Sequence, residues 1–157
     1  SFQGGLSLTF EVKNTGVQSF PYGMGWHPYF FTDNLHDAVL SFASRDFYSC
    51  NKRSIPVKTK EAELPEKFSL EDRVFDDAFS LDYPRCDLNT NGYNLSLEFK
   101  YPEGTYLQLY TPGHRQNIAI EPMTCVANSF NNKIGFSELS PGKSDTLRID
   151  LFYITKS

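Results

Sequence analysis

The sequence predicts an all-β chain folded as an antiparallel β-sandwich. Apolar residues alternate with polar ones in about ten short segments, which is the period-two pattern of strands with one buried face. Gly, Pro, Asn and Asp recur as turn signals roughly every 8–12 residues, and no segment has a convincing helical period. The 14 Phe and 9 Tyr residues also favour strands.

The first third of the chain predicts strands with two unusual glycines. Alternation is clear over residues 6–12, and a return strand is expected over residues 17–20, where Pro21 should interrupt it. Beyond Pro21 the chain is rich in aromatic residues, and Gly23 and Gly25 lie two positions apart. In a strand this spacing predicts a bulge or a close approach by another group.

The middle of the chain alternates between strands and a weaker region. Short strands are expected over residues 38–42 and around Phe47-Tyr48, whereas residues 51–73 are more charged and predict a long surface excursion. Residues 75–81 return to strand composition. Residues 93–110 contain two alternating runs separated by a Pro-Glu-Gly turn, and we expect them to form a hairpin.

The last third predicts a short apolar strand, a polar loop and a final strand. Ile118 to Ile120 form the apolar strand, which ends at Glu121-Pro122, and residues 123–135 read as the loop. Alternation resumes over residues 147–153. No repeat or linker divides the chain, so residues 1–157 are expected to form a single domain.

Composition excludes several classes of function. The net charge is −4 and the basic residues are scattered, which argues against a nucleic-acid partner. No apolar run approaches the roughly 18 residues of a membrane span. Three widely spaced cysteines without a CxxC pair argue against a disulfide framework or a structural zinc site and favour a reducing compartment, so we expect a cytoplasmic location.

Two ionisable residues stand beside prolines and apolar neighbours, His27 before Pro28 and Glu121 before Pro122. Proline restricts the residue before it to extended backbone, so the His27 ring should project from the sheet. A histidine and a glutamate that met in one pocket could act as acid and base. Each also has a structural reading, as a satisfied strand histidine and as a solvated strand end.

Asp76 and Asp77 are adjacent carboxylates in a predicted strand, so one should face inward and the other solvent. A turn-proximal acidic pair is the alternative reading. A metal site from His27, His36 and His114 matches no ligand spacing, and the sequence has neither a nucleophile elbow nor a phosphate-binding glycine loop. We therefore expect no metal site.

Four segments resemble the aldose 1-epimerase (galactose mutarotase) family. They are Gly-Trp-His-Pro-Tyr-Phe at 25–30, Phe-Asp-Asp-Ala-Phe at 75–79, Ile-Glu-Pro-Met-Thr-Cys-Val-Ala-Asn-Ser-Phe-Asn at 120–131 and Leu-Ser-Pro-Gly-Lys at 139–143. Their order and spacing are fairly specific. The resemblance spans essentially the whole chain but only the C-terminal part of the family's fold.

The resemblance implies a β-supersandwich enzyme that interconverts the α and β anomers of free hexoses without a cofactor. By position, Glu121 matches the family's catalytic base and His27 the acid that protonates the ring oxygen. Asp76 matches the carboxylate that receives sugar hydroxyls. Trp26 and Tyr29 would offer an apolar face to the sugar, unless they belong to the core.

The family's N-terminal portion, which contributes an arginine and another histidine to the pocket, is missing from these 157 residues. The resemblance thus implies that the missing N-terminal strands come from the full-length protein or another chain. Two other functions stay open: a non-catalytic carbohydrate-binding sandwich, and a mutarotase for hexose 6-phosphates. The second would need convergent cations such as Arg73 or Arg115.

Overall fold

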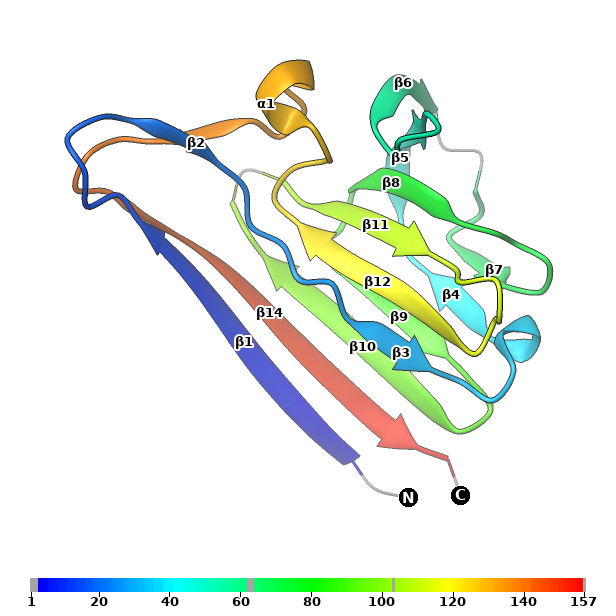
Figure 1. Cartoon of the computed structure of the whole chain (residues 1–157). Helices are drawn as coiled ribbons and strands as arrows, with labels where there is room; N and C mark the ends of the chain where they lie inside the picture. The colour runs from blue at the N-terminus through cyan, green and yellow to red at the C-terminus, as the bar shows by residue number, and fades with distance from the viewer. Residues whose placement is uncertain (1–2, 62–63, 103, 157) are drawn as a thin grey trace.

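Two antiparallel sheets stacked face to face make up the computed structural model, which describes residues 3–61, 64–102 and 104–156 (Figure 1). The described strands of the first sheet, here called the β14 sheet, are β1 (Gln3–Lys13), β14 (Ser144–Thr155), β10 (Tyr93–Lys100), β9 (Arg85–Asn89), β4 (Val39–Ser41) and β7 (Lys67–Ser69), in spatial order. Those of the second, the β12 sheet, are β3 (Tyr29–Phe31), β12 (Asn117–Met123), β11 (Tyr106–Tyr110), β8 (Asp76–Leu81), β5 (Ser44–Cys50) and β6 (Pro56–Glu61). The predicted antiparallel β-sandwich is confirmed.

The core lies between the two sheets and follows the alternation in the sequence. Leu97 and Phe99 of β10 face inward from the β14 sheet, and Leu109 and Ile120 face them from the β12 sheet; all four are at most 1% exposed. Since neighbouring residues of a strand point to opposite faces, burial of the apolar set turns the residues between them outward. In the β12 sheet this outward face carries the candidate site.

The predicted hairpin over residues 93–110 is wrong. β10 pairs with β9 and β14, whereas β11 pairs with β8 and β12, so the chain crosses from one sheet to the other between them. Tyr101 and Thr105 are buried at this crossing. Alternation fixes which face of each strand is buried, but it does not identify the strand's partner.

Other differences concern short strands and their partners. The excursion over residues 51–73 contains β6 and β7, and β9 was not predicted. The return strand is β2 (Phe20–Tyr22), which contains Pro21 and pairs not with β1 but with β13 (Ser137–Leu139) in a separate two-stranded ribbon. A ribbon edge tolerates proline because one side of the strand needs no backbone partner.

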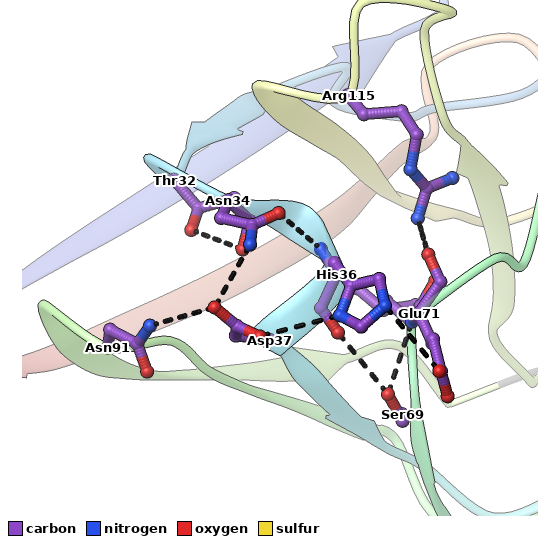
Figure 2. A network of polar contacts seen from close by, with 9 residues as sticks. Thr32, Asn34, His36, Asp37, Ser69, Glu71, Asn91 and Arg115 are labelled. Atoms are coloured by element: carbon purple, nitrogen blue, oxygen red, sulfur yellow. Dashed lines mark hydrogen bonds and ion pairs between the residues drawn. The ribbon is translucent and has the colours of Figure 1, made fainter.

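Two short helical segments complete the described chain: the 3₁₀ turn η1 (Leu35–Asp37) and α1 (Ser129–Asn132), which lies within the expected loop. The Asn34 side chain caps η1 by accepting a hydrogen bond from the His36 backbone amide. The His36 ring lies between the carboxylates of Asp37 and Glu71, at 3.4 and 3.5 Å (Figure 2). Within the described residues no helix is long and apolar enough to cross a membrane.

Arg115 fastens the loop before β12 to residues 70–73. Its guanidinium donates to the carbonyl oxygens of Leu70 and Arg73 at 2.8 and 2.9 Å. It also donates to the carbonyl oxygen of Glu71 (Figure 2). The Arg73 guanidinium in turn lies 5.1 Å from the centre of the Phe68 ring. Both arginines therefore serve contacts within the scaffold.

Candidate active site

Glu121 lies in β12 on the face opposite the core. Ile118 and Ile120 fill the interior at 0% exposure, which turns Glu121 to the outer face of the β12 sheet. Although it is on the outer face, Glu121 is only 8% exposed, because neighbouring segments cover it. A carboxylate so deeply covered needs a partner.

That partner is His27, which backbone contacts hold beside β12. The Trp26 amide donates to the Pro122 carbonyl at 3.1 Å, and the Ile120 amide donates to the Pro28 carbonyl at 3.4 Å. These two bonds bracket His27 and place it across from Glu121. Its Nε2 lies 3.1 Å from Glu121 Oε1, so the expectation that the two side chains meet is confirmed.

The glycines before His27 allow this approach. A Cβ at Gly23 would lie 2.4 Å from the sulfur of Cys125, and one at Gly25 would lie 3.2 Å from a side-chain carbon of Met123. Gly25 also forms an antiparallel bridge with Met123. The close approach predicted from the glycine spacing is confirmed, and its partner is the segment that follows Glu121.

The electrostatics of the pair favour proton exchange. Burial raises the pKa of Glu121 above its ordinary value, the charge of His27 opposes that rise and the charge of Asp76 adds to it. The His27 side chain is 56% exposed, so the imidazole keeps access to solvent. A carboxyl group with a raised pKa next to a histidine is a suitable base and acid pair near neutral pH.

Asp76 joins the same pocket from β8. Gln108 of β11, in register with Glu121, donates from Nε2 to Asp76 Oδ1 at 3.2 Å. Asp77 points the other way, toward Phe75 and Phe79 at a second cavity, and burial raises its pKa. Of the two carboxylates, Asp76 is therefore the one beside Glu121.

The two aromatic residues expected at the sugar have different positions. Tyr29 is half exposed, lines the pocket and lies over His27 with ring centres 5.1 Å apart. Trp26 packs edge-on against Phe30 and against the core, and it is not among the described residues that line the pocket. The expectation for Trp26 is corrected: next to an outward-facing His27, its side chain takes the core side.

The structure adds residues that the sequence did not single out. Gln108, Tyr110 and Ser54 line the pocket, which has a volume of about 860 Å³. Residues 127–131, which include the first three residues of α1, line it as well. Gln108 had a usable signal, since it is the polar residue between Leu107 and Leu109 and faces the same way as Glu121. Ser54 had none.

No metal site is found among the described residues: no group of three or more His, Cys, Asp and Glu side chains could hold an ion. His36 is engaged with Asp37 and Glu71, and His114 Nδ1 accepts from the Gln116 amide. The three histidines thus do not converge.

The fold has relatives among solved structures. The chain superposes on a galactose mutarotase-like protein from Clostridium acetobutylicum with a TM-score of 0.82 at 18% identity, covering 96% of this chain and 52% of that one. For a galactose mutarotase-like protein from Lactobacillus casei the TM-score is 0.79 at 19% identity, covering 96% and 60%. At this identity the likeness shows the fold alone.

A curated relative and a family model give sequence evidence. The uncharacterized protein YihR of Escherichia coli (strain K12) is 26% identical over 165 residues, covering 94% of this chain and 51% of YihR. The chain thus spans about half the length of the relatives it matches. The model of the aldose 1-epimerase family matches residues 2–151. The chain belongs to the aldose 1-epimerase family.

Proposed function

We propose that this chain provides the acid and base of a mutarotase that interconverts the α and β anomers of free hexoses. The observation that carries the proposal is the 3.1 Å contact between His27 Nε2 and Glu121 Oε1. The ring oxygen and the anomeric hydroxyl of an aldose are bonded to the same carbon, C1. An acid and a base that serve both must reach almost the same point, as these two side chains do.

In the proposed reaction, ionised Glu121 removes the proton from the anomeric hydroxyl while protonated His27 delivers a proton to the ring oxygen. The bond between C1 and the ring oxygen breaks, its electron pair goes to that oxygen, and C1 becomes an aldehyde. After rotation about C1–C2, neutral His27 takes the proton back from the hydroxyl as it attacks C1, and Glu121 returns its proton to the aldehyde oxygen. The other anomer forms and both residues regain their starting protonation.

The raised pKa of Glu121 supports this assignment. A base whose pKa lies nearer the working pH accepts a proton more readily, and the same group must donate it on ring closure. A carboxyl group at its ordinary pKa would be the weaker choice for a step that runs in both directions.

Asp76, Gln108 and Tyr29 would hold the sugar. Asp76 accepts hydroxyl hydrogen bonds, Gln108 offers both an amide donor and a carbonyl acceptor, and the exposed Tyr29 ring can cover the apolar C–H face of a hexose. All three line the same pocket as the acid and base.

The residues named for a phosphorylated substrate do not support that alternative. Arg115 is committed to backbone carbonyls, Arg73 to the Phe68 ring, and neither is among the described residues lining the pocket. We therefore propose free rather than phosphorylated hexoses.

Polarimetry of freshly dissolved α-D-glucose or α-D-galactose with the intact protein tests the proposal. Glu121→Gln keeps the shape of the side chain but removes the base, and we expect the enzymatic acceleration to fall about 10²–10⁴-fold. Glu98→Gln, on the β14 sheet, is the matched control and should leave the rate unchanged. Sugar binding without acceleration by the unmodified protein would instead identify a non-catalytic carbohydrate-binding module.

A further inference from the structure

The Asp76 carboxylate is held by two donors, one on each oxygen. Gln108 Nε2 donates to Oδ1 at 3.2 Å, and Ser54 Oγ donates to Oδ2 at 2.8 Å. Gln108 belongs to the adjacent strand, whereas Ser54 lies 22 positions earlier, in the turn between β5 and β6. Asp76 is exposed at the start of β8, so without these donors its carboxylate would rotate freely.

The turn that carries Ser54 is organised by Asn51. The Asn51 side-chain oxygen accepts from the amides of Arg53 and Ile55 at 2.8 and 3.3 Å, and its backbone carbonyl accepts from the Ser54 amide at 2.9 Å. This arrangement fixes the five residues from 51 to 55 without help from Asp76. The hydroxyl of Ser54 is therefore presented to Asp76 by a structured turn.

Ser54 adopts a backbone conformation that costs free energy. Its φ of 54° lies in the left-handed region, which glycine and asparagine occupy far more readily than serine. Strained residues are held by the structure around them and cluster at binding and active sites, and the only hydroxyl contact described for Ser54 is the one to Asp76. Ser54 also lines the pocket that holds His27 and Glu121.

We propose that Ser54 is a positioning residue that fixes the plane of the Asp76 carboxylate for recognition of sugar hydroxyls, an inference that rests on the proposed function. Each carboxylate oxygen accepts one hydrogen bond from the protein and keeps acceptor capacity for the ligand. A fixed plane lets the two oxygens meet two hydroxyls at set positions, so the turn between β5 and β6 contributes to which hexose is accepted. Ser54 acts through Asp76 and has no part in proton transfer.

Kinetics of the intact protein with α-D-galactose and α-D-glucose separate positioning from a structural role. We expect Ser54→Ala and Ser54→Gly to raise KM about three- to tenfold, on the scale of one typical hydrogen bond, with kcat unchanged. Ser54→Gly also relieves the left-handed backbone, so its Tm should be equal or higher while its KM is worse. Ser54→Asn tolerates that backbone and restores a donor, and should recover most of the affinity.

Ser69→Ala removes another exposed serine hydroxyl, which lies outside the pocket, and should change neither KM nor kcat. The inference is overturned if Ser54→Ala leaves KM unchanged while Asp76→Asn raises it, or if Ser54→Gly binds sugar as well as the unmodified protein. Failure of the proposed function looks different, because Glu121→Gln would then match the unmodified protein in the polarimetric assay.

Discussion

Glu121 of β12 and Asp150 of β14 are carboxylates of similar burial whose pKa values are shifted in opposite directions. They are 8% and 3% exposed, and each is on the second strand from the edge of its sheet. Asp150 accepts from Lys100 Nζ at 2.7 Å, Arg148 Nε at 2.9 Å and Ser7 Oγ at 2.6 Å, and these contacts hold its pKa below the ordinary value. Glu121 has His27 as its ion-pair partner, and burial holds its pKa above the ordinary value.

The difference shows how the surroundings of a covered carboxylate set its pKa in this fold. A carboxylate surrounded by permanent cations and a hydroxyl stays ionised and is a poor proton acceptor. One that is covered but only partly compensated keeps a tendency to take up a proton, which is what a general base requires. Burial alone does not separate the two; the number and permanence of their partners does.

The largest expected effect comes from removing the partner of Glu121. His27→Gln keeps a hydrogen-bonding side chain but cannot carry the exchanged proton, so kcat should fall about 10²–10⁴-fold. Asp150→Asn alters a carboxylate of similar burial and should leave kcat unchanged below its unfolding temperature. Polarimetric rates measured at saturating sugar check both predictions. A comparable loss of kcat in the two variants would contradict the distinction drawn between Glu121 and Asp150.

A second effect contrasts adjacent carboxylates within β8. Asp76→Asn weakens a charged acceptor that faces the pocket, and we expect KM to rise about 10- to 100-fold. Asp77→Asn changes a residue on the opposite face and should leave KM as it was. Isothermal titration with the sugar gives an independent measure of affinity; equal weakening in the two variants would mean that Asp76 has no direct part in binding.

The sequence predicts the placement of His27 and Glu121 better than that of the residues around them, for a physical reason. The direction of Glu121 follows from the burial of Ile118 and Ile120, and Pro28 restricts His27, so both assignments depend on local patterns. Choosing between Asp76 and Asp77 required knowing which sheet β8 joins. That depends on strand pairing, which alternation does not encode.

The same limit explains the errors. β10 and β11 both alternate cleanly and are separated by a turn, so nothing local distinguishes a hairpin from a crossing between sheets. Trp26 and Tyr29 have equal aromatic character, so residue type does not separate them; their positions relative to the outward-facing His27 do. Ser54 becomes visible only when the turn between β5 and β6 is seen beside Asp76.

The smallest expected effect concerns stability and its pH dependence. The pKa of Glu121 is higher in the folded state than in the unfolded state. The protonated Glu121 side chain therefore contributes most to the free energy of unfolding below the ordinary glutamate pKa, about 4.3, and this contribution declines as pH rises through the folded pKa. Glu121→Gln does not titrate and should be the more stable protein at neutral pH, by on the order of 1 kcal/mol, the scale of one incompletely compensated buried group. This advantage should vanish near pH 4.

Asp150→Asn should show the opposite sign. The lowered pKa of Asp150 means that its ionised form stabilises the fold above the ordinary aspartate pKa, about 3.9, and that this stabilisation is lost as pH falls toward the folded value. The variant should therefore be the less stable protein at pH 7, by a margin that narrows under acid. Urea unfolding at several pH values measures the free energy of unfolding of each variant relative to the unmodified protein. If both variants lost stability at neutral pH, Glu121 would be a satisfied structural carboxylate like Asp150, and the physical basis for choosing it as the base would fail.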